Sequence, residues 1–240
     1  MGVKSVKLVF NYKVGKILNY EAKSVVIRQV SKIMEVLDAN KFVSYSSINL
    51  KPVAYDEEGY HIRIKVYNRN VSEQEIAQEM TDDIKTTVIP VSNQVVYMLV
   101  SPRGEIIESA GSNEVSTLVF PDYDLNIGDS WTNPIKFSLP TVNKEANVNM
   151  VYTLKEITNN IAIIEAKSHE VSINIPINME LVSGKSETFE GNFIINLKSY
   201  TEFDLNLGTN VFQEINIDTI VKVQEYVMEN NVYNTIKLLG

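Results

Sequence analysis

The sequence predicts an all-β protein, and three observations lead to this class. First, valine and isoleucine together account for 55 of the 240 residues, whereas leucine and alanine account for 23. β-branched side chains lose rotamer freedom in helices and pack well on a pleated sheet. Second, apolar and polar residues alternate with a period of two along most of the chain, as in half-buried strands. Third, turn signals recur about every ten residues and allow roughly fifteen strands.

One segment has the period of a helix instead. Ser72 is a typical N-cap, and Glu75 stands three residues later, where a capping box requires an acidic residue. Ile76 and Met80 follow at a spacing of four and form a narrow apolar stripe. We therefore predict one short helix near 73–83. Its narrow stripe is typical of a lid that lies on a sheet, with a functional gate as the alternative.

Four pairs of alternating segments flank turn residues and predict β-hairpins. Pairs of asparagines and glycine-containing turns supply the left-handed conformations that tight turns require. The pairs are 95–100 with 105–108 around Pro102-Arg103-Gly104, 148–154 with 161–164 around Asn159-Asn160, 203–207 with 211–217 around Gly208-Thr209-Asn210, and 221–228 with 232–238 around Asn230-Asn231.

A faint internal repeat suggests how these elements are organised. An alternating motif that leads through a glycine to a large apolar residue occurs at 10–18, with Gly15, and again at 123–131, with Gly128. In the same order, Gly104-x-x-Ile107 is echoed by Gly208-x-x-Val211. A duplicated unit accounts for both echoes. We predict two similar fused antiparallel β units of the sandwich or half-barrel type, 1–117 and 118–240, which could also form a single continuous domain.

The second half resembles a group of uncharacterised bacterial β-rich proteins. The resemblance rests on the motif at 123–131, on the hairpin from Tyr152 to Ala162, and on Phe203-Asp204 followed by Gly208. Many members of that group are exported or lipid-anchored. The resemblance implies a bacterial protein of the cell envelope and supplies no catalytic residue. Lysine also far outnumbers arginine, a composition typical of AT-rich bacterial genomes.

Charge and composition exclude several classes of function. The net charge of −8 and the pI near 4.9 argue against a nucleic-acid partner, because such a partner requires a basic face. The absence of cysteine excludes thiolate nucleophiles and cysteine-ligated metals. No stretch approaches 18 apolar residues, so we expect no transmembrane segment. The first residues lack the pattern of a signal peptide. We therefore expect the periplasm or cell envelope if a leader was removed, and otherwise the cytoplasm.

The residues that could carry chemistry are few. His61 lies on the polar face of an alternating strand and His169 lies near a strand boundary. Neither has a partner at metal-binding spacing, so we interpret both as surface residues. Asp122, Asp124 and Asp129 resemble a calcium loop but lack its glycine and its final glutamate, and are better explained as turn carboxylates. Trp131, the one tryptophan, is predicted to fill the core. We predict no catalytic residue, metal or cofactor.

These features favour a non-catalytic binding module, associated with the bacterial envelope, for an apolar small molecule or a protein partner. Two alternatives stay open: a structural protein of a surface assembly, and a hydrolase that uses carboxylates alone. Two alternating sheets with one helix leave few elements to cover their apolar faces. We expect either complete burial of these faces or an apolar cavity of several hundred Å³, roofed by the helix through Ile76 and Met80. The binding residues themselves cannot be named from the sequence.

Overall fold

The computed structural model describes residues 5–32, 35–80, 84–111, 118–139, 144–180 and 186–240. Within these ranges it contains one helix and thirteen strands. The elements are β1 (Leu18–Lys32), β2 (Glu35–Tyr55), β3 (Tyr60–Asn68), α1 (Glu73–Glu79), β4 (Lys85–Val88), β5 (Gln94–Val100), β6 (Ile106–Ala110), β7 (Ser130–Leu139), β8 (Lys144–Thr158), β9 (Ile161–Ser168), β10 (Val171–Glu180), β11 (Ser186–Asp204), β12 (Thr209–Val223) and β13 (Tyr226–Leu238).

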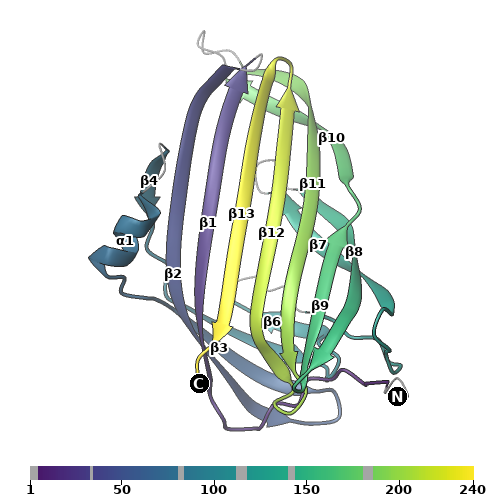
Figure 1. Cartoon of the computed structure of the whole chain (residues 1–240). Coiled ribbons are helices and arrows are strands. Elements are labelled where there is room, and N and C mark those ends of the chain that lie inside the picture. The colour runs from purple at the N-terminus through teal and green to yellow at the C-terminus, as the bar shows by residue number, and fades with distance from the viewer. Residues whose placement is uncertain (1–4, 33–34, 81–83, 112–117, 140–143, 181–185) are drawn as a thin grey trace.

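The strands form one large curved sheet (Figure 1). Its order is β6-β5-β3-β2-β1-β13-β12-β11-β9-β8-β7, with β10 beside β11 and β4 beside β2. All neighbours are antiparallel except β2 and β4. The prediction of an all-β fold is confirmed, and the architecture is an open sheet, because β6 and β7 do not pair. The first strand, β1, pairs with the last, β13, and this pairing joins the two ends of the chain into one sheet.

Local turn chemistry explains some hairpins and fails for one. Asn159 and Asn160 both have positive φ, +52° and +64°, as a type I′ turn between β8 and β9 requires. The turn predicted at Asn230-Asn231 is wrong, because both residues lie inside β13. The chain turns instead beside Gln224, whose φ is +53°. Pairing of β13 with strands on both sides outweighs the turn preference of two asparagines.

The turns that precede β1 and β7 have the same hydrogen-bonding pattern. Gly15 and Gly128 both have positive φ, +85° and +96°. The Gly15 N–H donates to the carbonyl oxygen of Pro52 in β2 at 2.8 Å, and the Gly128 N–H donates to that of Leu154 in β8 at 2.7 Å. Each glycine therefore hydrogen-bonds the turn before one strand to the strand that follows it in sequence, β2 after β1 and β8 after β7.

The apolar side chains gather in two clusters. The larger lies on β7, β8, β9, β10, β11 and β12, and the smaller lies on β3 and β5. The N-terminal segment connects them, because its Leu8 and Phe10 belong to the larger cluster and its Tyr12 packs against both. Its Phe10 ring contacts Phe120 and Phe203 of the larger cluster, at 5.1 and 5.5 Å between ring centroids, and its Tyr12 meets Tyr60 of the smaller one edge-on at 5.3 Å. Trp131 is 6 % exposed within the larger cluster, so its predicted packing role is confirmed.

Candidate functional site

The strand registers divide the sheet into two faces. Side chains alternate along a strand, and residues opposite each other on paired strands point the same way. Ile62 of the smaller cluster and Leu154 of the larger cluster therefore share one face when the registers are followed across the sheet. We call this the inner face, since it carries both clusters, and the opposite one the outer face.

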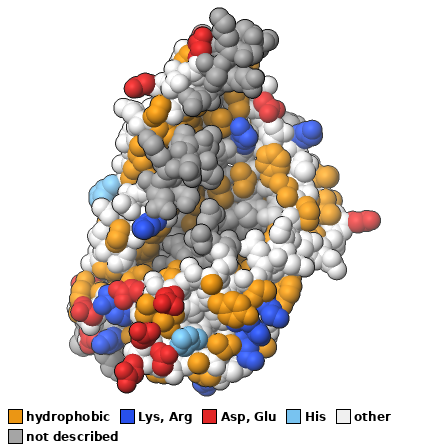
Figure 2. Space-filling view, turned by 180° about the vertical axis from the view of Figure 1, so that it is seen from behind, with side chains coloured by type: hydrophobic (Ala, Val, Ile, Leu, Met, Phe, Trp, Pro, Cys, Tyr) orange, Lys and Arg blue, Asp and Glu red, His pale blue; other side chains and the backbone are white. Residues whose placement is uncertain are grey.

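Between the two clusters, the inner face of the central strands carries apolar side chains that belong to neither cluster. All of them are partly exposed. They are Val26 and Val30 of β1, Phe42 of β2, Ile215 of β12, and Val232 and Ile236 of β13. We call this surface the central trough. From behind, the molecule shows a hollow bordered by hydrophobic side chains (Figure 2). The trough is the candidate site, because half-exposed apolar surface inside a concave sheet is where an apolar ligand gains most from burial.

Rows of polar groups cross the trough between the apolar ones. Ser44, Ser24 and Asn234 lie opposite one another on β2, β1 and β13. Four residues further along β1, beyond the row of Val26, the charged Arg28 lies opposite Asn230. Such groups let a mainly apolar site orient a ligand through a few hydrogen bonds.

One end of the trough is closed by tyrosines. The hydroxyl groups of Tyr20 and Thr209 lie 3.0 Å apart in a buried hydrogen bond. Burial raises the pKa of Tyr20, and it raises the pKa of Tyr12 strongly, with a further contribution from the nearby Tyr20. Both phenols are therefore neutral at physiological pH. They pack at this end of the trough, which we call the tyrosine floor, and offer no ionised group to a ligand.

Charged residues of the central strands lie mostly on the outer face. Along β12 the register places Glu214 and Asp218 there, and along β13 it places Glu229 there. In β1 from Leu18 to Val30, and along β12 and β13, the one charged residue on the inner face is Arg28. A pair of carboxylates that converge in a cleft, as a glycosidase requires, is therefore absent from these stretches of the inner face.

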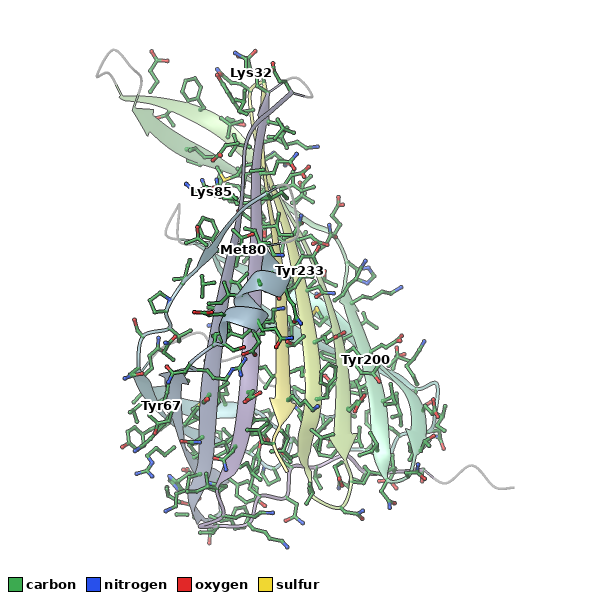
Figure 3. All side chains as sticks on the ribbon, turned by 60° about the vertical axis from the view of Figure 1, so that its left-hand side comes forward. Lys32, Tyr67, Met80, Lys85, Tyr200 and Tyr233 are labelled. Carbon is green, nitrogen blue, oxygen red and sulfur yellow. The ribbon has the colours of Figure 1, made fainter. Side chains whose placement is uncertain are left out.

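The helix does not roof the trough, contrary to our expectation. Glu79 of α1 forms ion pairs with Lys23 of β1 and with Lys41 of β2, and both lysines lie on the outer face. Figure 3 shows α1 in front of this face, on the same side of the sheet as the labelled Tyr233. The helix has no buried residue, and Met80 is 58 % exposed. The apolar stripe of Ile76 and Met80 is too narrow to be buried against the sheet, so ion pairs hold the helix in place. The capping box is present as predicted, and the helix ends at Glu79, while 81–83 lie outside the described residues.

Two further hollows are less suited to an apolar ligand. A groove of about 400 Å³ lies on the outer face over β8, β9, β11 and β12. Charged residues line much of it, among them Lys167 and Lys198, which lie directly opposite each other on β9 and β11. A small hollow of about 20 Å³ beside Tyr12 and Pro52 has room for about one water molecule.

The sequence-predicted polar residues lie at separate places on the surface. His61 is partly exposed and His169 is exposed. The His61 ring nitrogen lies 2.6 Å from Asp56, a partner that the spacing rules did not suggest, and this hydrogen bond is the main cause that lowers the pKa of Asp56. Asp129 accepts a hydrogen bond from the Asn126 N–H at 2.7 Å, as expected of a turn carboxylate.

In the part of the chain that the structure describes, no three His, Asp or Glu side chains gather closely enough to hold a metal ion. Among those same residues, no helix has the length and apolar character needed to cross a membrane.

Comparison with known proteins gives a partial family match and no activity. Residues 109–199 match DUF6263, a family of unknown function. The DUF6263 match begins at the end of β6 and includes most of β11. It therefore covers strands of the larger cluster and none of the residues that define the trough, which lie on β1, β2, β12 and β13. This match and the resemblance noted above both point to uncharacterised proteins. No curated protein matches the chain.

Proposed function

We propose that the protein is a non-catalytic module that binds an apolar or amphipathic small molecule along the central trough. The observation that carries this proposal is the row formed by Phe42, Val26 and Val232, three apolar side chains side by side on β2, β1 and β13. All three are partly exposed and outside both hydrophobic clusters. Burying such a row beneath an apolar ligand is favourable by about 25 cal/mol for each Å² removed from water.

Binding can be tested with two variants of adjacent residues. Val232→Glu places a carboxylate in the trough, whereas Tyr233→Glu places the same charge on the outer face, where Tyr233 is 40 % exposed. Native mass spectrometry of gently purified protein should reveal a co-purifying apolar molecule. Hexadecanoate at about 100 times its Kd should stabilise the wild type by about 2.7 kcal/mol in a thermal-shift assay. The Val232→Glu protein should lose this stabilisation and the Tyr233→Glu protein should keep it.

An apolar ligand is rejected by two results together: no co-purifying molecule, and no stabilisation of the wild type by fatty acids or phospholipids over a wide concentration range. The function would then be to bind a protein partner or to form part of a surface assembly. Equal loss of stabilisation in both variants would show that binding does not occur in the trough. No observation favours the carboxylate hydrolase.

We infer a bacterial origin and a location in the cell envelope. The lysine-rich, arginine-poor composition and the resemblance of the second half support this inference. The upstream sequence of the gene tests it. A leader peptide, with or without a lipid-anchoring cysteine, is the expected finding, and an upstream region that encodes no leader would contradict it.

We also infer that two sets of strands derive from one duplicated unit: β1, β2, β3, β5 and β6 in the first half, and β7, β8, β9, β11 and β12 in the second. The matching hydrogen bonds of Gly15 and Gly128 support it, as do the positive φ of Gly104 and Gly208 in the β5–β6 and β11–β12 turns. In an experimental structure, superposing β1, β2, β3, β5 and β6 on β7, β8, β9, β11 and β12 should align both glycine pairs. Glycines in unrelated positions would contradict the duplication.

A further inference from the structure

Arg28 occupies an unusual position on the inner face. It lies opposite Asn230 of β13 and Asn40 of β2, at the end of the trough away from the tyrosine floor. Its guanidinium makes one hydrogen bond, of 3.4 Å, to the sulfur of Met228. By contrast Lys32, further along the same strand, is paired with Glu225 at 2.6 Å.

Arg28 has no ion pair with a carboxylate among the described residues. The acidic residue closest to it by register is Asp38, which lies diagonally across on β2. The Asp38 carboxylate accepts a hydrogen bond from the Asn40 side chain at 2.7 Å. The guanidinium therefore keeps donors available, and these donors have the planar geometry that matches a carboxylate.

Donor and apolar rows lie next to each other in this part of the sheet. Asn230 pairs with Thr219 of β12, so polar side chains on four strands share the row of Arg28. The adjacent row, two residues along each strand, holds Phe42, Val26 and Val232 and lies about 7 Å away. The distance from the Arg28 row to the Tyr20 floor spans eight residues of β1, about 27 Å. This arrangement is complementary to a molecule with an anionic head and a long apolar chain.

We propose that the ligand is a single-chain amphiphile with a carboxylate head, which Arg28 binds while the chain lies along the trough toward Tyr20. This proposal rests on the proposed function, since it specifies the class of ligand for the same site. The Arg28 guanidinium has no ion pair among the described residues, and the nearby Asp38 carboxylate accepts a hydrogen bond from Asn40. An unpaired cation beside the apolar row selects an anionic over a neutral amphiphile. A charge-assisted pair of this kind contributes enough to change affinity by about tenfold.

The test compares two probes of equal chain length, hexadecanoate and hexadecanol, on three proteins. The wild type should bind both and should prefer hexadecanoate by about tenfold. Arg28→Gln should bind both with nearly equal affinity, because only the head-group contact is lost. Lys222→Gln is the matched control: it removes the same charge from the exposed outer face of β12 and should retain the preference.

The outcomes separate this proposal from the proposed function. If the wild type binds neither probe, the trough is not a site for apolar chains and both proposals fail. If both probes bind but the preference for hexadecanoate survives in Arg28→Gln, or is absent from the wild type, the role of Arg28 is wrong while the apolar site stands. Thermal unfolding of each variant without ligand provides the folding control, and an exposed residue such as Arg28 should change it little.

Discussion

At the scale of single residues, glycines show the difference between a conformational and a steric requirement. Gly15 and Gly104 both have positive φ, +85° and +96°. A β-carbon on Gly15 would meet nothing within 4 Å, whereas one on Gly104 would overlap the carbonyl oxygen of Leu118 and lie 2.7 Å from the Phe10 ring. Gly104 is therefore needed because the segment before β7 and the N-terminal segment pack directly against its turn.

Alanine substitutions should separate these two costs. Gly15→Ala should lower the free energy of unfolding by about 1–2 kcal/mol, the cost of a left-handed residue with a β-carbon. Gly104→Ala should cost clearly more, because backbone atoms must also move. Urea denaturation of both variants measures the difference. Equal losses would show that the Leu118 segment yields without cost.

At the scale of elements, α1 is held by charge. Glu79 pairs with Lys23 and Lys41, and Arg69 donates to Glu75 at 2.6 Å. Hydrogen bonds from the Ser72 backbone and from Arg69 lower the pKa of Glu75 to about 2. Burial opposes ionisation of Glu79, yet its lysine partners leave its pKa below the ordinary value. Both carboxylates are thus stabilised in their charged forms by the folded helix.

Acidification should therefore loosen α1. Because the folded-state pKa values are lower than the unfolded ones, the stabilisation is complete above about pH 4.5. It is lost as the pH falls toward about 2, near the Glu75 pKa. Hydrogen exchange of residues 73–80, corrected for intrinsic rates, should show progressive opening over this range. Protection that is unchanged down to pH 2 would contradict the charge-based attachment.

Removing one carboxylate should have the same effect at neutral pH. Glu79→Gln removes the ion pairs that the Glu79 carboxylate forms with Lys23 and Lys41, and loss of a partly buried ion pair is costly. Hydrogen exchange in α1 should become faster in this variant. Glu73→Gln, in the first turn of the same helix, should change the exchange much less, because no partner other than the helix dipole is lost.

At the scale of the whole molecule, the N-terminal segment holds the two clusters together. Phe10 is 5 % exposed and contacts Phe120 and Phe203, while Val6 exchanges backbone hydrogen bonds of 2.8 Å with Leu125. Together with the β1–β13 ladder, these contacts link residues 5–32 to the second half of the chain at both ends of β1. The sheet should therefore unfold as a unit.

Phe10→Ala should lower the stability by about 3–5 kcal/mol. Trp131 fluorescence and far-UV circular dichroism should still report one coincident transition. The reason is that Phe10 stacks on Tyr12, which contacts Tyr60 of the smaller cluster, while the β1–β13 ladder joins the two halves. Tyr123→Ala is the control: Tyr123 occupies the matching place in the second motif but is 51 % exposed, so its loss should cost far less. Separate transitions for the two probes would show that the halves unfold independently.

The sequence by itself determined what depends on neighbouring residues. β-branched composition and period-two alternation predicted the strands, Ser72 with Glu75 predicted the helix start, and Asn159-Asn160 predicted a turn, because each of these preferences acts within a few residues. Even Trp131 could be assigned to the core from its strand.

Only the tertiary structure decided the features that require distant pairing. Asn230 and Asn231 lie within a strand because β13 pairs with β1, about two hundred residues earlier in the chain. The same pairing brings Val26 beside Val232 and places Arg28 at the end of the trough. Alternation shows that a strand has two faces, but not which strand lies beside it, nor which face carries the partly exposed apolar row. The candidate site exists only across that register, so no local pattern could predict it.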